Sequence, residues 1–107
     1  MAVEYINSDN IGIQGQGLIE LQRIDTACDP ITGTSTVNAF INRYNPNIML
    51  GPTCSSTALA VAENITIPKN ILLLSSSASS PSISTLDDKN LVFRTIASDT
   101  QQAYTLA

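Results

Sequence analysis

A run of four apolar residues at positions 71–74 (ILLL) constrains the fold more than any other segment of the chain. The run is far too short to cross a bilayer as a helix, which takes about 20 apolar residues. Continuous apolar character over so few residues is expected of a parallel β-strand that is covered on both faces. We therefore expect a buried strand at 71–74, with a helical layer on each side of its sheet.

Strand-like and helix-like patterns alternate along the rest of the chain. Period-two or short apolar segments bounded by turn residues predict strands, and apolar residues at three- and four-residue intervals predict helices. The expected strands are 18–24, 47–50, 71–74 and 91–94. The expected helices are 1–8, 33–44, 58–62 and a last one capped by Ser98 or Asp99. A turn is expected at 10–15, and the cap of the helix at 58–62 is expected within 53–56. This alternation indicates an α/β domain with a parallel sheet.

Composition limits the classes of function that the chain can serve. At 107 residues it is one domain at most, and 43% hydrophobic against 13% charged residues favours a folded chain. The net charge is −4 and the five basic residues are scattered, so a nucleic-acid surface is not expected. No histidine and no CxxC pair are present, and neither a metal site nor a cofactor is expected. The residues after Met1 do not form a signal peptide, and we favour a chain that begins downstream of its export signal.

Two clusters of hydroxyl side chains follow two of the expected strands. They are residues 53–56 (TCSS) and 75–80 (SSSASS). In parallel α/β sheets, ligands bind beyond the carboxyl ends of the strands, where helix N-termini present free amides. The alternative is that these serines have only a structural role, capping a helix and lining a turn. The two cysteines, Cys28 and Cys54, are compatible with one disulfide or with free thiols, and composition leaves both readings open.

Four segments, taken in order, resemble the landmarks of the leucine/isoleucine/valine-binding protein family. They are residues 24–30 (IDTACDP), 51–57 (GPTCSST), 75–81 (SSSASSP) and 93–103 (FRTIASDTQQA). The family consists of type I periplasmic binding proteins, which are related to the ligand-binding lobes of amino-acid receptors. The resemblance extends over essentially the whole chain.

The resemblance implies a fold, a function and partners. The fold would be a flavodoxin-like lobe with a three-layer parallel sheet, and residues 1–107 would be part of an N-terminal lobe that lacks the family's first strand. The function would be binding of a small solute, an amino acid of the branched-chain or a similar class or a related small molecule, for an ABC-type importer. The partner would be the importer's permease, and the location would be periplasmic or extracellular.

The resemblance also assigns roles to individual residues. Cys28 and Cys54 match two cysteines that the family joins in a disulfide, which requires an oxidising compartment. Ser55 matches a serine whose hydroxyl and amide hold the ligand α-carboxylate. Ser77 stands where a backbone carbonyl accepts the ligand ammonium, and Ser79 where a threonine serves both ends of the ligand. Ser79 lacks the threonine methyl, and Ser76 replaces a common proline, so a looser turn is expected.

Other classes of protein fit the residues less well. An enzyme is not expected, because the chain has no histidine, no nucleophile–base pair and no GxSxG or P-loop spacing. Asp25 and Asp29 are expected to form turns rather than a catalytic carboxylate pair. The alternatives kept are the ligand-binding ectodomain of an amino-acid-sensing receptor, which would share the half-site, and a flavodoxin-like signalling domain, which would carry acidic residues at its strand ends.

The strand order implied by the resemblance has a consequence for association. In a sheet of order 2-1-3-4-5 the first strand separates the second from the third, which here are 18–24 and 47–50. Without it, both strands would leave backbone groups unpaired. We expect either that the two strands pair directly or that another chain fills the gap in a homodimer formed by strand exchange. The simpler alternative is that the gap is left open.

Overall fold

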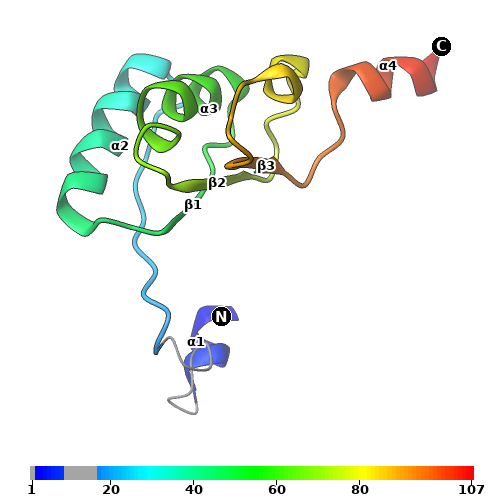
Figure 1. The fold of residues 1–107 in the computed structure, drawn as a ribbon. Coiled ribbons are helices and arrows are strands. Elements are labelled where there is room, and N and C mark those ends of the chain that lie inside the picture. The colour runs from blue at the N-terminus through cyan, green and yellow to red at the C-terminus, as the bar shows by residue number, and fades with distance from the viewer. Residues whose placement is uncertain (1, 9–16) are drawn as a thin grey trace.

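The computed structural model describes residues 2–8 and 17–107 of the chain, so the turn expected at 10–15 lies outside the described residues. Three short strands form one parallel sheet in the order β1-β2-β3 (Figure 1). They are β1 (Ile48–Leu50), β2 (Leu72–Ser75) and β3 (Val92–Arg94). Each lies within one residue of its expected position, and the parallel α/β class is confirmed.

Helical segments precede β1, connect the strands and follow β3. They are α1 (Ala2–Asn7), α2 (Pro30–Tyr44), α3 (Ser55–Val61), which continues as the π-helical turn η1 (Ala62–Thr66), the 3-10 turn η2 (Pro81–Thr85) and α4 (Asp99–Leu106). None of the helices formed by the described residues is long and apolar enough to cross a membrane. Helix α4 begins at the expected cap, where the Ser98 side chain accepts a bond from the amide of Thr100.

Helix α2 begins three residues before the position that apolar spacing predicts. Asp29 is its N-cap, and its carboxylate accepts a 2.7 Å hydrogen bond from the amide of Thr32. Pro30 occupies the first turn, where its fixed φ suits the helix and its missing N–H costs nothing. Asp29 also closes a turn, as expected, because its amide donates to the carbonyl of Thr26 at 3.2 Å, and Asp25 forms one by accepting from the amide of Ala27. The helix ends at Tyr44, ahead of Pro46, as expected.

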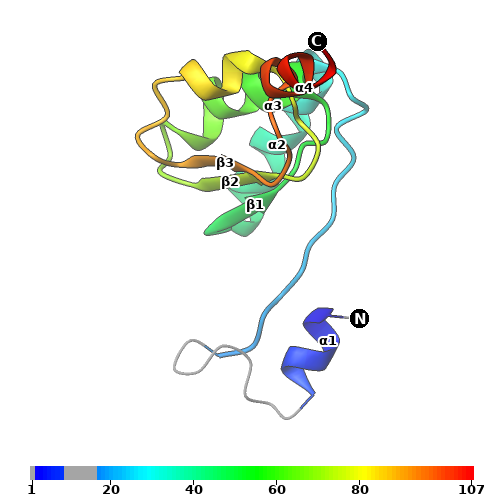
Figure 2. The same cartoon turned by 90° about the vertical axis from the view of Figure 1, so that its right-hand side faces the viewer.

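The core lies between α2, α3 and one face of the sheet (Figures 1 and 2). Its buried residues are Val37, Ile41, Val61, Ala62, Ile65, Ile67, Ile71 and Leu73. The side chains of a strand alternate between the two faces of its sheet. Met49, Leu73 and Val92 therefore face this core, and both Met49 and Val92 pack against it.

The opposite face of the sheet carries apolar side chains that the described residues leave open. Ile48 and Leu50 of β1 are 56% and 68% exposed, Phe93 of β3 is 48% exposed, and Leu72 and Leu74 are half-buried. The expectation that β2 is covered on both faces is therefore not met within the described residues. The helical layer that they supply, α2 and α3, lies on one side of the sheet.

The strand expected at 18–24 is wrong. These residues form an extended segment without strand pairing, and β1 pairs with β2 alone among the described strands. A strand is stabilised by its ladder, and alternation of side chains without a neighbouring strand does not create one. Leu18 and Leu21 accordingly remain 57% and 48% exposed. The two strands also do not pair directly, which was one of the two expected arrangements.

Helix α1 lies apart from the sheet and its helices in both views (Figures 1 and 2). In the chain it comes before the extended segment 18–24, which leads to α2. The side chain of Asn7 joins α1 to this segment through two hydrogen bonds. Its amide nitrogen donates to the carbonyl of Ile19 at 2.7 Å, and its oxygen accepts from the amide of the same residue at 3.0 Å.

Candidate functional site

The carboxyl ends of the three strands meet at one edge of the sheet. Two backbone hydrogen bonds continue the ladder beyond the last residues of β1 and β3. The amide of Gly51 donates to the carbonyl of Leu74 at 2.8 Å, and the amide of Thr95 donates to the carbonyl of Ser75 at 3.1 Å. The loops that follow β1, β2 and β3 are thus neighbours. In an open α/β sheet this is the edge at which ligands bind.

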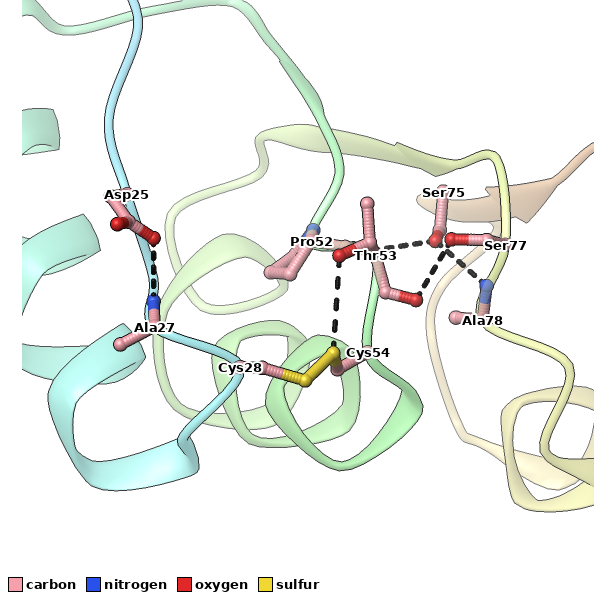
Figure 3. Close-up of a disulfide and its surroundings, with 9 residues drawn as sticks. All are labelled: Asp25, Ala27, Cys28, Pro52, Thr53, Cys54, Ser75, Ser77 and Ala78. Atoms are coloured by element: carbon pink, nitrogen blue, oxygen red, sulfur yellow. Dashed lines mark hydrogen bonds between the residues drawn. A yellow bond between two sulfur atoms is a disulfide. The ribbon is translucent and has the colours of Figure 1, made fainter.

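A disulfide between Cys28 and Cys54 lies beside this edge (Figure 3). The two Cα atoms are 5.5 Å apart, within the range that a disulfide requires. Cys28 precedes α2 in a turn where Ala27 and Cys28 both have positive φ, and Cys54 is the N-cap of α3. The bond therefore joins the starts of two helices that are separated along the chain.

Helix α3 has its cap within residues 53–56, as expected, but no serine provides it. The N-cap is Cys54, which makes no side-chain capping bond, and Ser55 is the first residue of the helix. The Ser55 side chain instead reaches across to the loop after β2, where its Oγ accepts a 3.2 Å bond from the amide of Ser80. A hydroxyl that accepts one bond keeps its own proton as a donor. Ser55 can therefore still donate to a ligand.

Ser75 supports this edge of the sheet from inside. Its side chain is buried at the end of β2, and its Oγ donates to the carbonyl of Pro52 at 2.7 Å (Figure 3). The same oxygen accepts from the amide of Ala78 at 3.2 Å. Ser75 belongs to the second hydroxyl cluster of the sequence, and in the structure its hydroxyl links the two loops and is not available to a ligand.

The other two expected ligand residues lie on the loop after β2. Ser77 is exposed, and its Oγ donates to the carbonyl of Thr53 at 2.9 Å. Ser79 is half-buried, and its carbonyl accepts from the amide of Asp99 at 3.0 Å. Each of Ser55, Ser77 and Ser79 thus lies at the carboxyl edge of the sheet: Ser55 in the first turn of α3, and Ser77 and Ser79 on the loop that follows β2.

A hollow of about 330 Å³ opens at the same edge. Its lining consists of Leu50, Gly51, Thr53, Leu74, Ser76 and Thr95. Its volume lies within the range of small-molecule pockets. None of the polar residues that line it, Thr53, Ser76 and Thr95, had an assigned ligand role. Ser76 and Thr95 come directly after the last residue of a strand, and that position is the signal that could have identified them.

Among the described residues, Arg94 is a cation that binds the loop carrying Ser77 and Ser79. Arg94 ends β3, and its guanidinium donates to the carbonyl of Ser80 at 2.8 Å, to that of Ala78 at 3.4 Å and to the hydroxyl of Ser84. Nearby, the Thr32 amide lowers the pKa of Asp29 below its ordinary 3.8. Hydroxyls, amides and carbonyls can hold a polar solute by complementary hydrogen bonds, and the chain has no histidine to act as a base.

Comparison with known proteins places this arrangement in a class. A family profile described as "Receptor family ligand binding region" matches residues 1–107. The fold is similar to that of an ABC transporter substrate-binding protein from Desulfitobacterium hafniense, with a TM-score of 0.83 and 27% sequence identity. That similarity covers 98% of this chain and 30% of the other chain. No curated protein sequence matches the chain.

The chain belongs to the receptor ligand-binding family, whose members have the type I periplasmic binding protein fold. Within that family, the described residues form a three-stranded part of a lobe, with α2 and α3 on one face of the sheet. The chain spans about a third of the length of the solved structure that it matches.

Proposed function

We propose that residues 1–107 form part of the first lobe of a two-lobed solute-binding protein that delivers an amino acid or a similar small zwitterion to an ABC importer. The observation that carries this proposal is that Ser55, Ser77 and Ser79 gather at the carboxyl edge of the sheet. A zwitterion needs donors for its carboxylate and acceptors for its ammonium, and hydroxyls and backbone groups supply both.

The bonds of the three serines are compatible with the roles that the resemblance implies for them. Ser55 keeps its hydroxyl proton for the ligand carboxylate, since its oxygen already accepts from Ser80. Ser77 is held by its side chain, which donates to Thr53, and its backbone carbonyl is the acceptor for the ammonium. Ser79 contributes its hydroxyl and amide between these two groups. The hollow lined by Ser76 and Thr95 receives another part of the solute.

The importer and the location are inferred from the matched structure and the disulfide. The Desulfitobacterium hafniense protein is a substrate-binding component of an ABC transporter, and this supports the same partner here. A disulfide persists in oxidising compartments, which supports a periplasmic or extracellular location. The second candidate function is that of an amino-acid-sensing receptor ectodomain, which the description of the matching family favours.

Calorimetry with the protein encoded by the complete reading frame tests the proposal. A panel of L-amino acids is titrated, and at least one is expected to bind. Ser55→Ala and Ser79→Ala should each weaken that binding roughly 10- to 100-fold, because each removes a hydrogen bond to a charged group. Ser35→Ala, on the exposed face of α2, is the matched control and should leave binding unchanged.

Two results would count against the proposal. One is that no amino acid on the panel binds the complete protein, and the other is that the Ser55 and Ser79 variants bind as tightly as the parent. The 107-residue chain by itself is expected to bind weakly or not at all, because such ligands are held by closure of two lobes. Micromolar binding by this chain alone would contradict the two-lobed site.

A further inference from the structure

Arg94 lies on the helix-covered side of the sheet, directly beside the loop that carries Ser77 and Ser79. It pairs in register with Ser75 of β2. Alternation along β3 directs Phe93 to the open face and Arg94 to the same side as Val92, which packs against the core. Arg94 is accordingly half-buried, whereas Phe93 is exposed.

The guanidinium of Arg94 donates to two backbone carbonyls and to one hydroxyl, and none of these bonds within the described residues is an ion pair. Its Nη1 donates to the carbonyls of Ser80 at 2.8 Å and Ala78 at 3.4 Å, and its Nη2 donates to the hydroxyl of Ser84. No carboxylate among residues 2–8 and 17–107 lies within ion-pair distance of it. Bonds from a guanidinium are charge-assisted, and its planar fork fixes the direction of each acceptor.

The two carbonyls that Arg94 holds flank a single residue, Ser79. The neighbouring backbone groups are also fixed: the Ala78 amide by Ser75 Oγ, the Ser80 amide by Ser55 Oγ, and the Ser79 carbonyl by the Asp99 amide. Bonds on both sides of Ser79 restrain the peptide planes that set the direction of its amide. The orientation of Ser79 is therefore determined by the β3 side chain as well as by its own loop.

We propose that Arg94 is the positioning residue of the ligand-binding loop: its guanidinium holds the carbonyls of Ala78 and Ser80 so that Ser79 between them presents its amide and hydroxyl to the solute. This inference rests on the proposed function for the identity of the solute, but the restraint of the loop can be measured without any ligand. Arg94 does not contact the solute itself, and it acts through Ser79.

Hydrogen exchange on the 107-residue chain tests the restraint. Arg94→Lys keeps the positive charge and the aliphatic stem but loses the fork. Amides in residues 78–84 should exchange roughly 10-fold faster in this variant, since two charge-assisted bonds are lost. Amides of α2 should change less than about twofold, because the core is untouched. Arg43→Lys, on the exposed surface of α2, is the control and should change neither region.

Two exchange results would overturn the inference. Unchanged protection at 78–84 in Arg94→Lys would show that the fork does not restrain the loop. An equal loss of protection in the loop and in α2 would show that Arg94 supports the whole fold and has no particular effect on Ser79.

Binding by the complete protein gives a second, independent readout. If Arg94 acts through Ser79, Arg94→Lys should weaken binding of the amino acid found by calorimetry about 10-fold. The double variant with Ser79→Ala should then bind less weakly than the sum of the two single losses predicts, because the Ser79 hydroxyl contact can be lost only once, while the Ser79 amide still depends on Arg94. Additive losses would contradict a role through Ser79. Failure of every amino acid to bind would reject the proposed function, while the exchange result would still decide the role of Arg94.

Discussion

Gly33 of α2 packs against Thr57 of α3 so closely that a Cβ atom at position 33 would lie 2.4 Å from Cγ2 of Thr57. Thr57 is fully buried, so its methyl group has no room to retreat. The two helices that begin at the ends of the Cys28–Cys54 disulfide therefore approach through a contact that only glycine permits. This contact brings the start of α3, with Ser55, to its place beside the sheet.

Gly33→Ala is expected to lower the free energy of unfolding by roughly 1–3 kcal/mol, the usual cost of overpacking a filled core. Without the clash, alanine would instead stabilise the helix by up to about 1 kcal/mol. Thr57→Ser removes the Cγ2 methyl group, so the double variant should recover part of the loss. Urea unfolding measures all three proteins, and Ser35→Ala on the exposed face of α2 is the control. A stabilised Gly33→Ala protein would show that the helices do not approach this closely.

The disulfide should contribute substantially to stability. It closes a loop with a sequence separation of 26, which corresponds to roughly 3.5 kcal/mol of lost unfolded-state entropy. The Cys28→Ala/Cys54→Ala variant should unfold at correspondingly lower urea concentration than the oxidised protein. Adding a reductant to the parent should give a similar shift and should leave the double variant unchanged. Two reactive thiols per chain in unreduced, exported protein would rule out the bond.

Asp29 should make the stability of the fold depend on pH at the acid end. Its pKa is lowered in the folded state, first by the backbone amide of Thr32 and then by the Thr32 side chain, relative to an ordinary value of 3.8. The folded state therefore favours the carboxylate. The ionised Asp29 carboxylate therefore contributes to the free energy of unfolding. This contribution is fully present above the pKa that Asp29 has in the unfolded chain, and it is lost as the pH falls through the lower pKa of the folded state.

Asp29→Asn removes the charge of the side chain but keeps an oxygen that can cap the helix. Asparagine caps helices about as well as aspartate, so the melting temperature near neutral pH should change little. The variant should lose less stability than the parent between about pH 4 and pH 2. Asp29→Ala, which lacks the cap, should melt at a lower temperature at neutral pH. Parallel acid profiles for Asp29→Asn and the parent would contradict the assignment. Thermal melts followed by circular dichroism at each pH make the measurement.

Strand β1 is expected to make the 107-residue chain self-associate. Ile48 and Leu50 are exposed on this strand, which pairs on one side with β2 and carries no charged residue. Such an edge is a template for another chain, as in strand exchange. Sedimentation velocity at low micromolar concentration should detect a dimer. Leu50→Lys should shift the equilibrium toward monomer, and Ile31→Lys, at a still more exposed apolar position on α2, should not. A parent that stays monomeric would exclude association through this strand.

Local pattern was enough to predict most of the architecture. The ILLL run, the short strands on either side of it and the helix after Ser98 appear within a residue of their expected positions. The start of α2 was missed because apolar periodicity begins at the first core residue, whereas the helix begins at its cap. Asp29 and Pro30 are residue types that mark the start of a helix, and the spacing of apolar residues does not take them into account.

The candidate site was predictable in its location more than in its details. The two hydroxyl clusters pointed to the carboxyl edge of the sheet, and the resemblance selected Ser55, Ser77 and Ser79 within them. Residue type does not distinguish Ser75, whose hydroxyl links two loops, from Ser55, whose proton remains available. A hydroxyl can donate or accept, and its use depends on which backbone groups the fold brings near it.

By itself, the sequence determined the elements whose reasons are local: a parallel sheet of short apolar strands, helices begun by capping residues, and loops rich in hydroxyls. The tertiary structure alone decided what depends on a partner distant in the chain. Residues 18–24 have a strand-like pattern and yet form no strand, because a ladder needs a neighbour. Gly33 needs Thr57, and Arg94 needs the carbonyls beside Ser79. Each of these contacts exists only when the two segments fold against each other.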